Sequence, residues 1–191
     1  MSKPPAEVVV VRHGETEWSR SGQHTGRTDI PLTENGRREA ELVGERLRGR
    51  RFALVLTSPL QRAAETARLA GVDAEVRDEL REWDYGTYEG RTTIDIRQER
   101  PGWTLWRDGV PDGETADEVG RRVDRVVDEV RAVDGDVALF AHGHVLRVLA
   151  ARWLGLSPDN GRLFALDPAT ISILGYERET PVIRLWNYRS A

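Results

Sequence analysis

The sequence has no cysteine among its 191 residues. This absence excludes disulfide bonds, thiolate nucleophiles and metal sites built from cysteine. Long apolar runs are also missing: no stretch approaches the length of a transmembrane helix, and residues 1–7 lack the apolar core of a signal peptide. We therefore expect a cytoplasmic protein that does not bind a membrane.

An excess of positive charge is absent as well, because 28 lysines and arginines stand against 32 aspartates and glutamates and give a net charge of -4. The whole chain thus has no attraction for nucleic acid or anionic lipid, and any anion site must be a local cluster of cations. No linker rich in proline, serine or glycine divides the chain. We expect one domain over residues 1–191, long enough to bury a sizeable core.

The sequence does contain a run of four valines, Val8–Val11, followed directly by Arg12 and His13. Branching at Cβ favours an extended chain, and no position in the run is polar, so we expect a strand buried on both faces. The apolar segment Val137–Phe140 repeats the pattern and leads into His142. Two strand tips are therefore expected to hold His13 and His142 side by side.

Further segments alternate between strand and helix patterns. Short apolar runs predict strands at 53–56, 74–76, 170–174 and 182–186. Apolar residues at helical spacing predict helices at 33–48, 60–69, 115–130 and 145–153. Thr115 and Glu118 fit a capping box at the start of the third helix. The alternation predicts an α/β fold with a mostly parallel central sheet and helices on both faces.

The predicted helix at 60–69 carries one candidate site residue. Ser58 suits its N-cap and Pro59 its first helical position. Its packing face, through residues such as Ala63 and Ala67, is expected to exclude Arg62. Arg62 would then lie in the first turn, near the tip of the valine strand.

Three segments without a clear period predict loops or short irregular elements: 15–30, 80–90 and 91–113. We expect the last to form a short helix and a loop that covers a site. Its tryptophans, Trp103 and Trp106, either cap the pocket or pack locally, and local packing is the commoner outcome.

The candidate catalytic residues all lie at or just beyond the ends of predicted elements: Arg12, His13, Arg62, Glu82 and His142. Two guanidinium groups and two imidazoles around one carboxyl form an anion site that can also transfer protons. Helix N-termini after Ser58 and His142 would add backbone N–H groups. Such a pocket is expected to take a phosphoryl group.

These residues belong to short motifs that recur in one family. The motifs, in chain order, are Arg12–Thr16, Arg62 after Ser58 and Pro59, Glu82 before Tyr85 and Gly86, Gly113–Glu114, and Ala141–Gly143. In this order they resemble the histidine phosphatase superfamily, also called phosphoglycerate-mutase-like, over nearly the whole chain. The resemblance implies the three-layer fold of that family.

Longer segments narrow the resemblance to the sedoheptulose-1,7-bisphosphatase-like branch and related actinobacterial phosphatases. These segments are 18–26, 80–83, 106–109 and 142–144. Ser19 departs from the asparagine usual in the mutases, and the segment between Gly90 and Gly113 is shorter than the insertion of the cofactor-dependent mutases. Both departures weaken a mutase assignment.

The resemblance implies a two-step mechanism that needs no metal or cofactor. His13 would attack phosphorus as a neutral imidazole, with its pKa lowered by the neighbouring cations. Arg12, Arg62 and His142 would bind the equatorial oxygens. Glu82 would protonate the leaving oxygen and then deprotonate the attacking water.

Several assignments have alternatives. His142 and His144 could form a metal pair, but no further histidine or cysteine cluster completes a site. Only the resemblance selects Glu82 from the nearby acids, which also include Glu79, Asp84 and Glu89. Candidate contacts to the rest of the substrate, which could equally be scaffold, are Ser19, His24, Thr25, Gly26, Tyr85, Gly143, His144 and Arg147.

We therefore predict a phosphatase that hydrolyses a phosphomonoester, such as a sugar phosphate or a similar small metabolite, through a phosphohistidine on His13. The first alternative is a phosphoglycerate mutase. The second is a phospholigand-binding protein without catalysis, which would require a lost catalytic residue, and none is missing.

Overall fold

The central element is a six-stranded sheet in a computed structural model that describes residues 6–189. Its strands, in the spatial order β3-β2-β4-β1-β5-β6, are β1 (Val8–Arg12), β2 (Leu54–Thr57), β3 (Glu75–Val76), β4 (Val137–Ala141), β5 (Ile171–Glu177) and β6 (Thr180–Tyr188). Strands β3, β2, β4 and β1 run parallel, and β5 is antiparallel to both of its neighbours. The prediction of a mostly parallel sheet is confirmed.

Strand β1 lies between β4 and β5, with Arg12 in register with Ala141 of β4. Its valines are buried on both faces, as predicted, and alternate between two apolar clusters. Val8 and Val10 belong to one cluster, and Val9 and Val11 belong to the other. Because successive side chains of a strand point to opposite faces, β1 links both halves of the core.

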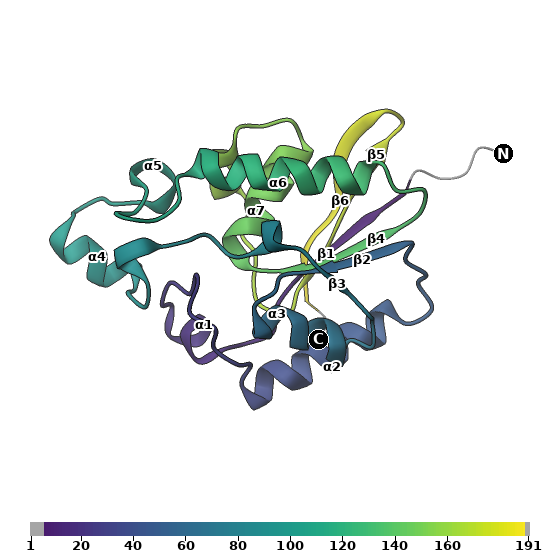
Figure 1. The fold of residues 1–191 in the computed structure, drawn as a ribbon, viewed down its shortest axis with the longest axis horizontal. Helices are drawn as coiled ribbons and strands as arrows, with labels where there is room; N and C mark the ends of the chain where they lie inside the picture. The colour runs from purple at the N-terminus through teal and green to yellow at the C-terminus, as the bar shows by residue number, and fades with distance from the viewer. Residues whose placement is uncertain (1–5, 190–191) are drawn as a thin grey trace.

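Helices cover both faces of the sheet, which gives the three layers seen in Figure 1. Helices α6 (Ala116–Arg131) and α7 (Gly143–Trp153) lie above the sheet in that view, and α2 (Glu34–Leu47) and α3 (Gln61–Leu69) lie below it. The capping box of α6 is present, with Thr115 as its N-cap residue. No helix formed by residues 6–189 has the length and apolarity needed to cross a membrane. The prediction about a signal peptide falls largely on residues 1–5, outside the described residues.

The irregular segments hold more helix than the sequence predicts. A short helix, α1 (Glu17–Ser21), interrupts the expected loop at 15–30 and begins with a capping box between Thr16 and Ser19. The segment 91–113 forms two short helices rather than one, α4 (Thr93–Glu99) and α5 (Leu105–Asp108). Three 3-10 turns complete the set: η1 (Asp78–Leu80), η2 (Gly86–Tyr88) and η3 (Pro158–Leu163). Figure 1 shows α4 and α5 projecting from one end of the sheet.

Helix α3 begins two residues later than predicted, so the expected N-cap at Ser58 and first helical position at Pro59 are wrong. Its N-cap is Leu60, which has an extended backbone conformation and a side chain that makes no cap hydrogen bond. The hydroxyl of Ser58 instead accepts the N–H of Leu60 at 3.2 Å and contacts His142. A side chain that serves the site is therefore unavailable to cap the helix.

Candidate active site

The site begins at two neighbouring strand tips. His13 follows β1 and His142 follows β4, and the backbone N–H of His13 donates to the carbonyl of Ala141 at 3.0 Å. The two imidazole rings lie 5.1 Å apart between centroids, and only 5% of His13 and 0% of His142 is exposed. The parallel pairing of β1 with β4 thus brings together two histidines that are far apart in sequence.

The orientation of the His13 ring is fixed by its own loop. Nδ1 lies 2.7 Å from the carbonyl oxygen of Gly14. Because a carbonyl oxygen only accepts, we assign the ring proton to Nδ1, which leaves the lone pair on Nε2. Burial, together with the charges of Arg62 and Arg12, lowers the pKa of His13 well below its usual value. The ring is therefore neutral at pH 7 and has a free lone pair on Nε2.

Arg12 offers an unsatisfied donor next to His13 in the sequence. One terminal nitrogen of its guanidinium donates to the carbonyl of Leu166, but its Nε is buried without a hydrogen-bond partner among the described residues. Burial lowers the pKa of Arg12, while the charge of Glu82 opposes this effect. A buried, unpaired N–H of a cation is costly, and an anionic ligand would satisfy it.

Arg62 is completely buried, with 0% exposed, so the prediction that the packed face of α3 excludes it is wrong. Its Nε donates to Nδ1 of His142 at 3.1 Å. Its two terminal nitrogens donate, at 2.9 to 3.0 Å, to the carbonyls of Thr25, Gly26 and Thr28. Burial of a guanidinium is tolerated here because its donors are matched by fixed acceptors.

His142 is held on both sides of its ring. Since Nδ1 accepts from Arg62, the neutral ring carries its proton on Nε2, which donates to the hydroxyl of Ser58 at 2.7 Å. Burial and the charge of Arg62 lower the pKa of His142 well below its usual value. Ser58 is a site residue that the sequence indicated only as a helix cap.

The carboxyl of Glu82 sits at the N-terminus of α7. It accepts the backbone N–H groups of Trp83, His144 and Val145, each at 2.9 Å. Two of these belong to the first turn of α7, which we expected to bind a phosphoryl group, so that expectation is wrong for these two groups. A protein carboxylate occupies them instead, which fits the positive end of the helix.

The neighbouring acids have partners elsewhere, which favours Glu82 among the four acids that the sequence left open. Glu79 pairs with Arg125 at 3.2 Å, and Asp84 pairs with Arg27 at 2.8 Å. Glu89 accepts the N–H groups of Gly26 and Thr28, at 2.9 and 3.0 Å. Of these four acids, Glu82 alone lines the cavity that contains His13.

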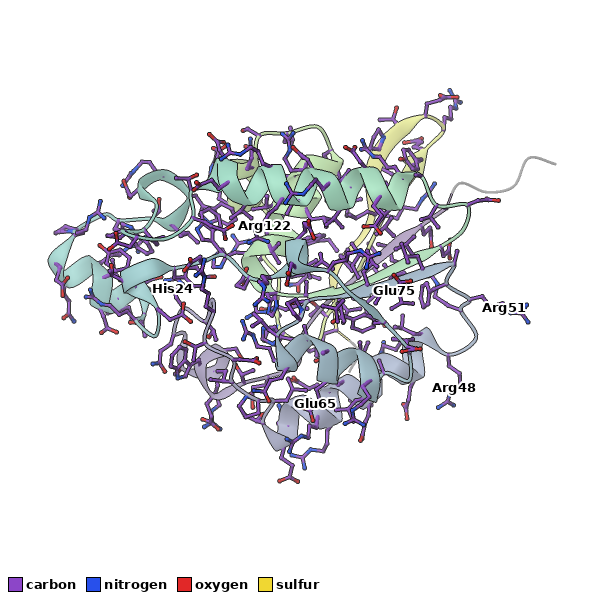
Figure 2. The ribbon with its side chains drawn as sticks, in the orientation of Figure 1. His24, Arg48, Arg51, Glu65, Glu75 and Arg122 are labelled. Atoms are coloured by element: carbon purple, nitrogen blue, oxygen red, sulfur yellow. The ribbon has the colours of Figure 1, made fainter. Side chains whose placement is uncertain are left out.

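The loop that carries Glu82 is held by Arg122 of α6, a residue that the sequence analysis did not single out (Figure 2). Nε and one terminal nitrogen of Arg122 form a two-point contact with the Glu114 carboxylate at 2.8 and 2.9 Å. Its terminal nitrogens also donate to the carbonyls of Glu79, Arg81 and Glu82, at 2.6 to 3.2 Å. Arg122 thus fixes the backbone of Glu82 from α6.

One cavity of about 160 Å³ joins these groups. Its lining contains ten of the thirteen predicted site residues: Arg12, His13, Ser19, His24, Thr25, Glu82, Tyr85, Gly143, His144 and Arg147. Arg62, His142 and Gly26 are not in the lining. The sequence analysis missed Gly22, Gln23 and Leu166, which also line it.

The side of the cavity next to Glu82 is formed by Tyr85, His144 and His24. The Tyr85 hydroxyl and Nδ1 of His144 share a hydrogen bond of 2.6 Å, and the rings of Tyr85 and His24 lie 4.8 Å apart. Burial lowers the pKa of His144 well below its usual value, lowers that of His24 to about 4, and raises that of Tyr85 well above 10.0. All three side chains are therefore uncharged at pH 7.

Trp103 and Trp106 pack against the histidines that form this side of the cavity. The Trp103 ring lies 5.8 Å from the ring of His24, and the Trp106 ring lies 5.3 Å from that of His144. Neither tryptophan lines the cavity. Of the two outcomes that the sequence allowed, local packing is the one observed.

Some predicted contact residues have their polar groups already occupied. The Ser19 hydroxyl belongs to the capping box of α1, and the Thr25 hydroxyl donates to the carbonyl of Gln23 at 3.2 Å. Gly26 is packed so closely that a Cβ there would approach the Trp83 carbonyl oxygen to 2.6 Å. Gly143 lies against the guanidinium of Arg12, because a Cβ at position 143 would be 3.4 Å from Cζ and Nε of Arg12. These positions shape the site rather than offer free donors.

Within residues 6–189, histidine and acidic side chains form no group of three or more that could hold a metal ion. The local chemistry is instead that of a phosphoryl site: a neutral imidazole, a guanidinium with an unpaired N–H and a carboxyl share one cavity. This arrangement can bind an anion, form a covalent bond to it and move a proton.

Comparison with known proteins agrees with this chemistry. A family model for the histidine phosphatase superfamily (branch 1) matches residues 8–189. The chain is 42% identical over 175 residues to an acid phosphatase of Mycobacterium tuberculosis, which covers 89% of this chain and 86% of the relative. It is 36% identical over 217 residues to a sedoheptulose 1,7-bisphosphatase of Saccharomyces cerevisiae, covering 95% and 79%.

The fold is also shared with solved structures. The structure of an open reading frame product from Mycobacterium tuberculosis superposes with a TM-score of 0.91 at 38% identity, over 95% of this chain and 97% of that one. Both the predicted fold class and the predicted similarity to phosphatases of this superfamily are confirmed.

Proposed function

Because the chain belongs to branch 1 of the histidine phosphatase superfamily and hydrolyses phosphoric monoesters through a phosphohistidine, we propose that this intermediate forms on His13. The observation that carries the proposal is a shared cavity. In it, His13 presents a neutral ring with its lone pair on Nε2, Arg12 has a buried unpaired Nε, and Glu82 supplies a carboxyl. Nucleophile, anion donor and proton carrier are within one space.

In the first step, Nε2 of His13 forms a bond to phosphorus while the bond between phosphorus and the leaving oxygen breaks. Glu82, in its protonated form, gives its proton to that oxygen. In the second step, water attacks phosphorus, Glu82 takes a proton from the water, and the bond between Nε2 and phosphorus breaks. The carboxyl returns to its starting state, so the cycle is balanced.

Arg12, Arg62 and His142 stabilise the charge on the transferred group in this proposal. Nε of Arg12 donates to an equatorial oxygen, which satisfies the N–H that otherwise has no partner. Arg62, which donates to His142 and is not in the lining, acts through its charge, and His142 turns its Nε2–H from Ser58 to a phosphoryl oxygen. Such positioned donors act on a transition state in which charge is spread over three oxygens.

The test is detection of the covalent intermediate. Brief reaction with a ³²P-labelled phosphomonoester, followed by quenching in alkali, should leave label on the wild-type protein that is released by acid. His13→Asn should carry no label and should lose roughly 10⁴-fold or more in kcat, as expected when a nucleophile is removed. The matched variants His24→Gln and His144→Gln should still be labelled, although more slowly.

Label on His13→Asn, or wild-type turnover by that variant, would overturn the assignment. The same assay separates a phosphatase from a phosphoglycerate mutase. A phosphatase releases inorganic phosphate from 3-phosphoglycerate, whereas a mutase converts it to the 2-phospho isomer with little release. A binding protein without catalysis would give neither product.

We also propose that residues 1–191 act as a single domain in the cytoplasm, on small phosphate esters rather than on nucleic acid or a membrane. The net charge of -4 supports the second part, because the chain as a whole repels polyanions. The cations that the proposal needs are local: Arg12 and Arg147 line the cavity, and Arg62 donates to His142.

A further inference from the structure

The position of Glu82 determines where the rest of the substrate lies. In the proposed function, Glu82 protonates the leaving oxygen, so the leaving group must extend over the side chains that surround this carboxyl. Nδ1 of His144 is 4.0 Å from Oε2 of Glu82, and Tyr85 and His24 continue the surface. We name His24, Tyr85 and His144 the leaving-group wall.

The leaving-group wall is polar but carries no charge at pH 7, for the reasons given above. Neutral imidazoles and a phenol can each both donate and accept a hydrogen bond, which matches the hydroxyl groups of a polyol. A second carboxylate or phosphate on the leaving group would lose water against this wall, and none of its three side chains supplies a positive charge in return. It would also lie close to Glu82, a like charge once the proton has been transferred.

Arg147 is the one cation besides Arg12 in the described lining of the cavity, so it is the candidate partner for a second anion. Its guanidinium is already anchored. Nε donates to the Gly161 carbonyl at 3.1 Å, and the group stacks over the ring of Trp106 at 4.8 Å. Arg147 is therefore held against the η3 segment and against Trp106. Since the Trp106 ring packs beside His144, Arg147 supports His144 indirectly.

The size of the cavity also limits the leaving group. About 160 Å³ must hold the phosphoryl group and the atoms next to it. We propose, on the basis of the function proposed above, that the preferred substrates are monoesters of short, uncharged polyols, bound by hydroxyl groups at the leaving-group wall. A second anionic group on the substrate lowers its use by this site.

Two probes of equal length test the proposal. Glycerol 3-phosphate and 3-phosphoglycerate each have three carbons with a terminal phosphate, and they differ in a CH₂OH group against a carboxylate. We expect kcat/KM for phosphate release at pH 7.5 to be at least about tenfold higher for glycerol 3-phosphate, because a charge that no cation compensates is unfavourable in the site. Equal values, or a preference for 3-phosphoglycerate, would overturn the proposal.

Variants of His24 extend the test to the ratio of the two kcat/KM values, which does not depend on the absolute rate of each variant. His24→Arg places a cation in the wall and should shift the ratio of the two kcat/KM values toward 3-phosphoglycerate by about tenfold. His24→Gln keeps a neutral hydrogen-bonding side chain and should leave the ratio within about twofold. A ratio that His24→Arg does not move, in a variant that still forms the ³²P intermediate, counts against the wall as the leaving-group site.

Arg147→Gln tests the competing explanation. If Arg147 only supports the wall, both substrates should lose kcat/KM by the same factor. A loss confined to 3-phosphoglycerate would show that Arg147 binds a second anion, and the inference would be wrong. Failure of the proposed function is distinguishable, because then neither substrate would give a phosphoenzyme that depends on His13.

Discussion

The two halves of the cavity are built in different ways. The phosphoryl floor, which consists of Arg12, His13, Arg62 and His142, comes from strand ends and a helix of the central layers. The leaving-group wall comes mainly from the loops around α1 and η2, with His144 in the first turn of α7. In Figure 2, His24 lies on the side of the molecule where α4 and α5 project.

The halves also differ in charge and in the number of contacts that fix them. In the floor, Arg62 and His142 have hydrogen-bond partners on all sides, and burial together with the charges of Arg62 and Arg12 lowers the pKa of His13. In the wall, the side chains are neutral and rest on one another and on tryptophans. The floor can therefore keep one chemistry while the wall changes with the leaving group, which is the division that the predictions below test.

The largest effect should come from the floor. Arg12→Met removes the unpaired Nε and its charge from the phosphoryl site, and we expect kcat/KM to fall by about 10³-fold, at the upper end for loss of one electrostatic donor. Because this contact is made to the transferred group, the loss should be equal for glycerol 3-phosphate and 4-nitrophenyl phosphate. A loss that depends strongly on the leaving group would place Arg12 in the wall instead.

Glu82 stands at the border of the two halves, and its loss should depend on the leaving group. Glu82→Gln cannot donate or remove the proton, so kcat for glycerol 3-phosphate should fall by about 10²-fold or more. The activated leaving group of 4-nitrophenyl phosphate needs little protonation, so the fall there should be smaller, less than about tenfold if formation of the phosphoenzyme limits the rate. Equal losses for the two substrates would point to another acid.

Arg122 should act through Glu82, so the loss of rate in its variant should depend on the leaving group in the same way but be smaller. Arg122→Met frees the carbonyls of Glu79, Arg81 and Glu82, and we expect about a tenfold loss for glycerol 3-phosphate, since a small misplacement of a catalytic group is costly. The loss for 4-nitrophenyl phosphate should be smaller.

A matched control lies one turn along the same helix. Arg125 of α6 is exposed and, within residues 6–189, pairs with the side chain of Glu79 alone, so Arg125→Met should change neither rate by more than about twofold. If Arg122→Met slowed both substrates equally, Arg122 would be a structural residue and not one that positions Glu82.

The sequence predicted the floor well because its residues follow regular elements. Periodicity located the strands that end at His13 and His142, and parallel strands must end at the same edge of the sheet. Arg62 was assigned to the correct helix but to the wrong environment. Periodicity ranks side chains by hydrophobicity and cannot detect that the carbonyls of Thr25 and Gly26, from a distant loop, accept its donors.

The residues that position Glu82 and the wall were less predictable. The partners of Arg122 are largely backbone carbonyls about forty residues away, and a carbonyl has no residue-specific signal in a sequence. The family motif at Gly113–Glu114 was the one available indication, since Glu114 is the carboxylate that Arg122 binds. Likewise, α1 is too short for its period to be recognised, although Thr16 is its N-cap.

The smallest effect concerns how the free energy of unfolding depends on pH. Both halves of the cavity contain histidines that contribute to this dependence. The chain has four histidines, and burial lowers the pKa of every one in the folded state. Below pH 6.5 the unfolded chain binds protons that the folded chain does not, so the free energy of unfolding falls as the pH falls. Each histidine contributes up to about 1.4 kcal/mol per pH unit between its ordinary and folded pKa values.

For His24 this window runs from 6.5 down to about 4. His24→Gln removes one of the four contributions, so its urea midpoint should fall less steeply than that of the wild type between pH 7 and pH 5. Titration of carboxylates is common to both proteins and cancels in the difference. Parallel curves would mean that His24 is as easily protonated in the folded protein as in the unfolded chain, so burial in the wall would not lower its pKa.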